Sequence, residues 1–521
     1  MVRRSAALVL ACWALAAPGP AVSRLPEAVE RAVGRVSTDD LRKYVETLAS
    51  DELNGRGVGD RGNRAAEEFI CATLRANGVT PAGAGGSCYQ PVDVFEPALG
   101  PAPRLTVSDA AGTVADLSIG ADFYPLPETG PATASAPLVF AGHGVTEPRL
   151  KHDDYKNVEA RGAIVLVREG LPDKLAGMDR LDAGQPGPGT LARKVSDARA
   201  HGAVGVVVIG GYLAGYRSIW PEHTSIRQAS YRLVSEIRES PLPVATISEQ
   251  AAGPILRALD GHRPLTAALA PDLLVRTVTM NNVLAIVEGR DPKRRGEMVV
   301  VGAHLDHDGT DAEGRIYNGA DDNASGTAAV LAAAIAFARA AAEGERPARA
   351  VLFALWNGEE KGSLGAEAFV ASPEPARRVV ANLNLDMVGR HEEVRDPGDW
   401  RFHGLPKTDA AATGNTLHVL GYSYTPDLAA MLREANGAVG LTLQEDYDSG
   451  EQGLLQRSDN WPFLAHGIPA LFLTTGLHPD YHTPDDDAGR IDFGKLTRVA
   501  RLAARAAWIV ADGPEPAIRK R

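Results

Sequence analysis

The sequence has few cysteines and no excess of positive charge, and both deficits narrow the classes of protein it can represent. Its 521 residues contain three cysteines, none at the spacing of a zinc knuckle. No G-x-S-x-G elbow occurs, and no cysteine follows Cys88 to serve as a nucleophile. The net charge of -12 argues against nucleic acid or an anionic membrane as the main partner.

Long apolar runs are also scarce, and a short one near the start has the pattern of a secretory signal. Arg3 and Arg4 precede an apolar run at residues 6–17, and residues 21–23 offer a small-residue cleavage site. We therefore predict that residues 1–23 are a signal peptide and that the chain is exported, to the periplasm or outside the cell. The run is too short for a transmembrane helix, and we expect no other stretch to span a bilayer. Sec and twin-arginine export both stay open.

The cysteines leave one question open. Cys12 lies inside the apolar run, which continues past it, so a lipid anchor at this residue is disfavoured. Cys71 and Cys88 would remain in the exported chain. They either form a disulfide that closes a short loop after a helix-like segment or stay as two buried thiols.

The residue composition and the spacing of apolar runs change twice along the chain, which predicts two domains. Short valine-rich runs separated by glycine and proline fill residues 126–271 and indicate a small β-rich α/β domain. Residues 24–125 and 272–521 would form one discontinuous domain around this insert. Beyond residue 281, strands and helices alternate, which predicts a mostly parallel sheet covered by helices on both faces. The strands are expected at 282–287, 298–301, 350–355, 379–384, 416–420 and 470–475.

One stretch of the larger domain gathers residues that commonly bind metals. The apolar run at 298–301 is followed by His304, Asp306 and His307, and a polar loop then leads to Asp321 and Asp322 before an alanine-rich helix pattern at 324–342. Open α/β sheets build their sites outside the carboxyl ends of strands. Histidine and carboxylates at such a place predict a divalent metal of zinc type.

Further acidic residues and a histidine follow three other predicted strands. Glu359 and Glu360 come after the strand at 350–355, where one carboxylate can bind metal while its neighbour accepts a proton from water. Asp386 closes the buried run at 379–384 and needs a cation or strong donors there. His482 follows the strand at 470–475. The repetition predicts one site assembled from several strand ends.

The motifs HLDH, GADDNASG, NGEE, LDMVGR and YHTPDD occur in this order. Together they resemble the co-catalytic zinc aminopeptidases of metallopeptidase family twenty-eight, which include the bacterial leucyl aminopeptidases. The segment LASDELNGRGVGDRGNRAAEEFI is similar to the amino-terminal segment of that family. The valine-rich insert resembles a protease-associated domain. The resemblance thus implies a zinc exopeptidase fold, of phosphorylase/hydrolase-like type, with an inserted domain of this kind.

The resemblance also implies a role for each matching residue. Asp322 would bridge two Zn²⁺ ions, His304 and Asp386 would complete one metal site, and Glu360 and His482 would complete the other. Glu359 would be the general base, and Tyr481 would stabilise the oxyanion. Asp306 would orient His304, and Asp459 and Asp486 would be supporting residues.

We therefore expect an exported aminopeptidase that acts on peptide substrates, with its oligomeric state open. A carboxypeptidase or dipeptidase on the same scaffold is the first alternative, and an arginine or lysine pocket for a free carboxylate would mark it. A one-zinc glutaminyl cyclase and a non-catalytic binding domain, such as the transferrin receptor ectodomain, are disfavoured because the full ligand set and Glu359 are present. The segment Gly389–Gly414 is longer than the compact link usual in the family, so the rim of the site is expected to differ.

Overall fold

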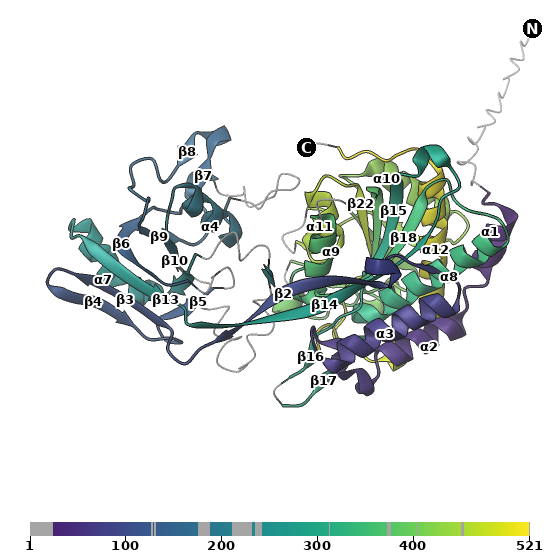
Figure 1. The fold of residues 1–521 in the computed structure, drawn as a ribbon, viewed down its shortest axis with the longest axis horizontal. Coiled ribbons are helices and arrows are strands. Elements are labelled where there is room, and N and C mark those ends of the chain that lie inside the picture. Colours follow the sequence, from purple (N-terminus) through teal and green to yellow (C-terminus); the bar gives the residue numbers. More distant parts are fainter. Residues whose placement is uncertain are drawn as a thin grey trace, which may run out of the picture.

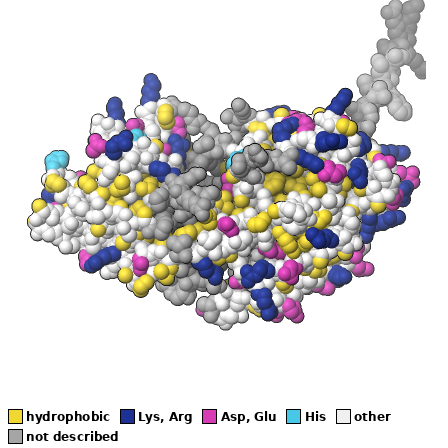
Figure 2. All heavy atoms as spheres, viewed as in Figure 1, with side chains coloured by type: hydrophobic (Ala, Val, Ile, Leu, Met, Phe, Trp, Pro, Cys, Tyr) yellow, Lys and Arg dark blue, Asp and Glu magenta, His cyan; other side chains and the backbone are white. Residues whose placement is uncertain are grey.

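The chain folds into two lobes joined by two long strands (Figure 1). The computed structural model describes residues 24–126, 129, 132–175, 188–210, 232–234, 242–311, 313–371, 377–402, 404–449 and 453–519. The predicted signal peptide, residues 1–23, lies outside this described part. Figure 2 shows positive and negative side chains interspersed over one face of both lobes, with no large field of one sign there.

The larger lobe is built on a mixed sheet with four parallel strands at its centre. Its strand order is β11-β2-β14-β18-β15-β19-β22-β20-β21, and β1 pairs with β14. The bounds are β1 Thr80–Pro81, β2 Tyr89–Leu99, β11 Arg232–Leu233, β14 Leu273–Val287, β15 Glu297–His304, β18 Ala350–Trp356, β19 Arg378–Leu385, β20 Thr416–Leu420, β21 Thr442–Gln444 and β22 Ala470–Thr474.

The predicted mostly parallel sheet is therefore corrected to a mixed sheet. Pairings among β18, β15, β19 and β22 are parallel, as expected for strands joined through helices. The β2–β14 pair is antiparallel over eleven residue pairs because the chain leaves the lobe along β2 and returns beside it along β14. The pairs β14–β18, β11–β2, β1–β14 and β22–β20 are antiparallel as well.

Helices cover both faces of this sheet, as the sequence predicts. Alternate residues of β15 point to opposite cores, so Val299 and Val301 pack in one and Met298 and Val300 in the other. Helices α9 (Leu364–Val370) and α11 (Asn460–Ala465) contribute to the second core. The first core receives α1 Glu27–Gly34, α2 Thr38–Leu48, α3 Arg61–Ala76, α8 Gly326–Ala342, α10 Pro426–Asn436 and α12 Phe493–Asp512.

The helix that contains α8 is apolar on all sides. Residues 320–342 have a mean hydropathy of 1.5 over their most apolar window, which makes this one stretch long and apolar enough to cross a membrane, contrary to the expectation from the sequence. However, 83% of that window is buried inside the lobe. Phe337 packs against Phe353 and Trp508 with ring centroids 5.3 and 5.1 Å apart. The apolar surface is therefore accounted for by a buried core helix.

The smaller lobe holds an eight-stranded sheet of order β4-β3-β13-β6-β9-β10-β12-β5. Within the described residues, its α-helices are α4 (Leu191–Ala200) and α7 (Glu249–Asp260). Because β3 and β4 pair in this sheet, the smaller lobe begins near residue 104, earlier than the predicted boundary at 126. Its bounds are β3 Arg104–Asp109, β4 Gly112–Leu117, β5 Phe123–Pro125, β6 Ala134–Phe140, β9 Ile164–Arg168, β10 Gly205–Ile209, β12 Val244–Ile247 and β13 Leu265–Ala270.

Cys71 and Cys88 form a disulfide, so the first of the two sequence alternatives holds in this structure. Cys71 lies in α3 and Cys88 directly precedes β2. The bond ties the amino-terminal helices to the edge of the larger sheet.

Candidate metal centre

The predicted ligands meet at the carboxyl ends of the parallel strands. His304 is the last residue of β15, Asp386 follows β19 directly, and Glu360 comes shortly after β18. His482 lies in the loop after β22, and Asp322 lies in the turn that leads into α8. Neighbouring parallel strands end at the same edge of a sheet, so residues far apart in the sequence come together there.

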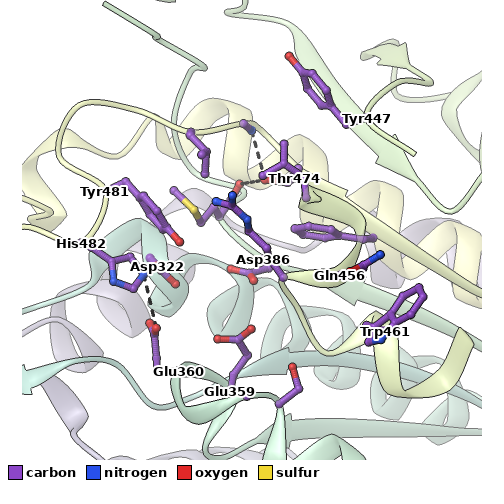
Figure 3. Close-up of a pocket in the computed structure, with 18 of the residues that line it drawn as sticks. Asp322, Glu359, Glu360, Asp386, Tyr447, Gln456, Trp461, Thr474, Tyr481 and His482 are labelled. Atoms are coloured by element: carbon purple, nitrogen blue, oxygen red, sulfur yellow. Dashed lines mark hydrogen bonds and ion pairs between the residues drawn. The ribbon is translucent and has the colours of Figure 1, made fainter. Parts of the chain in front are cut away.

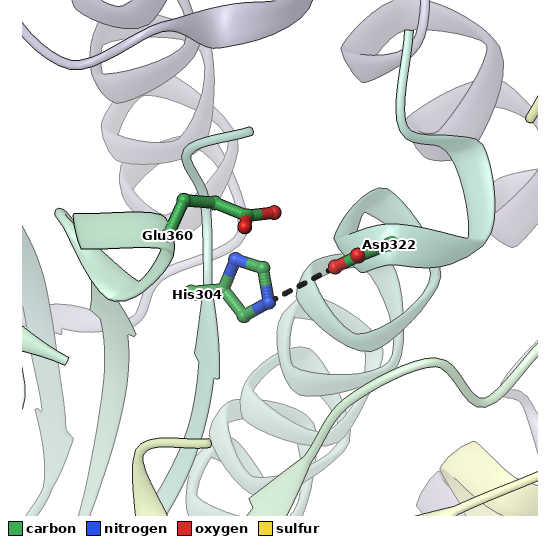
Figure 4. Close-up of side chains that lie close together, drawn as sticks. All are labelled: His304, Asp322 and Glu360. Carbon is green, nitrogen blue, oxygen red and sulfur yellow. Dashed lines mark ion pairs between the residues drawn. The ribbon is translucent and has the colours of Figure 1, made fainter. Parts of the chain in front are cut away.

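Asp322 occupies the middle of this group. Its Oδ1 lies 3.3 Å from Nε2 of His304, and its Oδ2 lies 3.3 Å from Nε2 of His482. Figure 4 shows Asp322 at the start of its helix, facing His304 and Glu360. One carboxylate therefore presents a separate oxygen to each histidine.

The other ligands divide between the two histidines. Asp386 Oδ1 lies 3.3 Å from Nε2 of His304, and Glu360 Oε2 lies 3.5 Å from Nε2 of His482. Figure 3 shows His482 and Glu360 side by side at the cavity, with Asp386 on its other side. The geometry thus gives two overlapping groups, one around each histidine, that share Asp322. Glu360 also approaches both groups, because its carboxylate lies within 4.8 Å of the ligand atoms of His304 and Asp322 as well as of Asp308 and His482.

The charge of the centre shows what kind of ligand it suits. Burial lowers the pKa of His304, but Asp386 and Glu359 raise it well above its ordinary value. The carboxylates therefore stabilise positive charge at the position of the imidazole. Imidazole nitrogen and carboxylate oxygen are the donors that Zn²⁺ takes in catalytic sites, so the residues present fit zinc.

Glu359 and Tyr481 border a cavity of 370 Å³ beside these groups. Burial raises the pKa of Glu359 well above its ordinary value, and burial also raises the pKa of Tyr481. Figure 3 shows both side chains directed towards the space between Asp386 and His482. The apolar part of the cavity wall comes from Met387, Tyr447, Leu454, Trp461, Phe472 and Leu477.

Comparison with known proteins agrees with this geometry. Residues 282–507 match the model of Peptidase family M28. The chain carries a domain of that family. The match confirms, for residues 282–507, the resemblance drawn from the five motifs.

Several relatives resemble the chain over different lengths. It is 25% identical over 509 residues to the probable lipoprotein aminopeptidase LpqL of Mycobacterium tuberculosis, covering 91% of this chain and 84% of that protein. It is 28% identical over 352 residues to the probable glutamate carboxypeptidase AMP1 of Arabidopsis thaliana, covering 64% of this chain. Only 44% of that second relative is spanned. An aminopeptidase from Aneurinibacillus sp. strain AM-1 shares the fold, with a TM-score of 0.56, 19% identity, and coverage of 94% of this chain and 98% of that one.

Asp306 of the peptidase domain contacts other partners than predicted. Its carboxylate accepts hydrogen bonds from the backbone amides of Glu359 and Glu360, at 3.1 and 3.3 Å. Nδ1 of His304 lies 3.1 Å from the Asp306 carbonyl oxygen and 3.8 Å from its carboxylate. The main chain of Asp306 therefore orients His304, and its side chain fixes the turn that holds the two glutamates.

Asp486 and Asp459, the other two predicted supporting residues, differ in their hydrogen bonds. Asp486 accepts hydrogen bonds from the backbone amides of Asp321 and Asp322, both at 3.0 Å, which positions the shared carboxylate. Asp459 is completely buried, and neither of its carboxylate oxygens has a hydrogen-bond partner among the described residues. Burial raises the pKa of Asp459 well above its ordinary value. Asp486 thus has a hydrogen-bonding role at the centre, whereas the Asp459 carboxylate makes no hydrogen bond to the described residues.

Three residues that contact the centre were given no role from the sequence. Asp308 Oδ2 lies 2.9 Å from Nδ1 of His482, on the ring nitrogen that faces away from Asp322. Ser458 donates to Asp386 Oδ2 at 2.6 Å. Asp308 stands in the string HLDHD and Ser458 directly before Asp459, so both were visible, but only the folded chain shows which ligand each one contacts.

The third missed residue is Arg56, whose guanidinium is completely buried beneath the centre. It donates to the carbonyl oxygens of Leu305, Asn318 and Gly319, at 2.8, 2.7 and 2.9 Å. Burial lowers its pKa to about 10, while nearby carboxylates, including Asp306, act in the opposite direction. Arg56 is therefore charged at neutral pH. It belongs to the LNGRG part of the amino-terminal segment that is similar to that of the family.

Proposed function

We propose that this chain is an exported dizinc aminopeptidase that removes amino-terminal residues from peptides. The observation that carries the proposal is the position of Asp322, whose two oxygens face two different histidines at 3.3 Å each. A carboxylate placed in this way can bind two ions at once, as in two-metal hydrolases. Together with Asp322, His304 and Asp386 would hold one zinc ion, and Glu360 and His482 would hold the other.

Two zinc ions, when bound, supply a Lewis acid for the scissile carbonyl and lower the pKa of water at the centre. Glu359 then acts as general base towards this water and delivers the proton to the leaving amine. No described residue donates a hydrogen bond to the Glu359 carboxylate, so its oxygens are available to the reacting water. The raised pKa of Glu359 suits a group that must hold a proton between the two steps.

Tyr481 is the proposed donor to the oxyanion. Burial raises the pKa of its hydroxyl, so the group stays protonated and can donate a hydrogen bond as negative charge develops on the carbonyl oxygen. Its neighbour His482 is one of the proposed ligands, and this adjacency places the donor at the edge of the metal centre.

Cleavage from the amino end is proposed because of the acids that border the cavity. Asp386 and Glu359 both line it, and their carboxylates can accept hydrogen bonds from a free amino group of the substrate. A cavity of 370 Å³ is at the small end of ligand sites, which suits an exopeptidase. A carboxypeptidase or dipeptidase is the second candidate, since one relative is named a probable glutamate carboxypeptidase.

We also propose that the smaller lobe is a protease-associated domain and that residues 1–23 direct export. The lobe interrupts the peptidase domain between β2 and β14, as the sequence resemblance implies. Exposed charges of both signs on the visible face suit a soluble exported enzyme (Figure 2). The name of one relative, a lipoprotein aminopeptidase, supports export.

Hydrolysis of leucine p-nitroanilide by the purified chain tests the proposal. The rate should fall on treatment with a chelator and return on addition of zinc. Glu359→Ala should still bind two zinc ions, measured by elemental analysis, yet lose several orders of magnitude in rate because it lacks the proton acceptor. Glu46→Gln, at an exposed position of α2, is the matched control and should keep the wild-type rate.

Peptides blocked at their amino or carboxyl end decide from which end the enzyme cleaves. An aminopeptidase should cleave a carboxyl-blocked peptide such as leucyl-glycine amide and leave N-acetyl-leucyl-glycine intact. The reverse pattern would replace the proposal by a carboxypeptidase. A wild-type rate in Glu359→Ala would refute the assigned base, and one zinc ion per chain would refute the two-metal centre.

A further inference from the structure

The cavity beside the metal centre contains one permanently charged cation. Arg457 lines it together with Asp386, Tyr481 and His482. Among the described residues of the cavity wall, it is the single lysine or arginine. It directly precedes Ser458, which donates to Asp386 at 2.6 Å, so its backbone is tied to the metal centre.

Among the described residues, the Arg457 side chain has no hydrogen-bond or ion-pair partner, unlike Arg390 and Arg401 nearby. Arg390 pairs with Asp480 at 2.7 Å, and Arg401 pairs with Asp399 at 2.7 Å. For the Arg457 side chain, no hydrogen bond or ion pair exists within the described part of the chain, and the residue is exposed. A guanidinium that faces a cavity without a protein acceptor is available to an acceptor on a substrate.

Arg457 lines the same cavity as Tyr481, the proposed oxyanion donor. A substrate group bound by Arg457 would lie in the same cavity as the scissile bond.

We propose that Arg457 binds a carboxylate of the substrate, so that this chain prefers peptides carrying a negative charge within one or two residues of the cut. This inference rests on the proposed function. The planar fork of arginine matches a carboxylate through two parallel hydrogen bonds. Trp461, Phe472 and Leu454 line the same cavity and can contact the apolar part of the bound peptide.

Two parts of a peptide offer this chemistry. One is the free carboxylate at the carboxyl end of a dipeptide, and the other is the side chain of a glutamate or aspartate. A free carboxyl end would make the chain a dipeptide-preferring enzyme, whereas an acidic side chain would make it selective for acidic residues. The cavity volume of 370 Å³ accommodates either as part of a small peptide.

Two matched substrate pairs separate these sources. Leucyl-glycine is compared with leucyl-glycine amide, and glutamate p-nitroanilide with glutamine p-nitroanilide, by kcat/KM. For at least one pair, the carboxylate member should be preferred by about tenfold over its amide, because a charge-assisted pair is lost in the amide. The first pair reports the carboxyl end and the second reports the side chain.

Substitutions of Arg457 test whether its guanidinium causes the preference for the carboxylate substrate. Arg457→Gln should abolish the tenfold preference, and Arg457→Lys should restore part of it because it keeps the charge without the fork. Gln456→Ala changes the neighbouring neutral residue of the same cavity wall and should keep the full preference. An equal carboxylate-to-amide ratio in wild type and Arg457→Gln, for both pairs, would overturn the inference.

Leucine p-nitroanilide carries no carboxylate, so its zinc-dependent hydrolysis reports the proposed function alone. Binding gives a second measurement that needs no turnover. Leucyl-glycine, leucyl-glycine amide, glutamate and glutamine are titrated calorimetrically into zinc-loaded Glu359→Gln, with and without Arg457→Gln. The inference expects about tenfold weaker binding of one carboxylate probe in the double variant, with its amide unchanged. Equal affinities for every probe would refute it, whatever the peptidase assay shows.

Discussion

Replacing Arg401 by glutamine should loosen the loop that carries Tyr481 and His482. Arg401 lies in the long segment Gly389–Gly414, and its Nη1 donates to the carbonyl oxygens of Pro479 and Tyr481, at 3.1 and 2.9 Å. The side chain is only 19% exposed. Its guanidinium therefore holds the backbone on both sides of residue 480 in place for the adjacent ligand.

The size of the effect follows from these two bonds. Hydrogen bonds from a charged donor contribute about 1.5–3 kcal/mol each when buried, and glutamine can replace one of the two, so the loss is about 2 kcal/mol. If this energy favours the metal-binding conformation of the loop, its loss lowers the affinity for the zinc ion at His482 by about 30-fold. The value lies within the range of about 10–100-fold known for residues that support metal ligands.

Competition with a chelator of known affinity measures this effect. Arg401→Gln should release one of its two zinc ions at about 30-fold higher free zinc than the wild type, while the ion at His304 is retained. Arg395→Gln is the control, since Arg395 belongs to the same segment, is 71% exposed and pairs only with Glu393 among the described residues. Two unchanged zinc affinities in Arg401→Gln would show that the segment does not support the loop.

Three further changes test other contacts. Asp308→Asn should weaken zinc binding about 10–100-fold by removing the acceptor behind His482, and unchanged chelator competition would contradict this. Cys71→Ser with Cys88→Ser should lower the free energy of unfolding by about 3 kcal/mol in urea, because the bond closes a loop between residues 17 apart, and an unshifted midpoint would refute it. Lys495 is completely buried, which lowers its pKa from 10.5 to about 8. Between these values the unfolded chain binds more protons, so stability relative to Lys495→Met should rise by about 3 kcal/mol from pH 8 to pH 10.5, and a constant difference would contradict this.

The central strands were predictable because both of their faces are buried. Such strands form continuous apolar runs, and the runs at 298–301, 350–355 and 379–384 lie inside β15, β18 and β19. The edges were not predictable in the same way. The predicted strand at 282–287 is only the end of β14, whose first part pairs with β2 at residues about 180 positions away. Pairing between such distant residues leaves no local pattern in the sequence.

That the proposed ligands lie close together was predictable from the same rule, since strand ends in an open sheet meet at one edge. The residues that support them were not. Ser458 and Asp308 approach their ligands from loops, and Arg401 reaches the Tyr481 backbone from a segment that looked like an irregular insertion. Polar loop residues of this kind are common in any sequence. Only their distance to a ligand separates them from solvated ones.

Arg56 shows why the amino-terminal segment belongs to the centre although it supplies no ligand. The turn at Asn54, Gly55 and Arg56 has left-handed backbone angles, with φ values of 46°, 65° and 53°, and it directs the guanidinium inward. Because its pKa of about 10 lies well above neutral pH, it keeps a fixed positive charge next to Asp306 and Asp322. This charge offsets part of the repulsion among the carboxylates before any metal binds. The LNGRG motif is thus explained by electrostatics at a site more than 240 residues further along the chain.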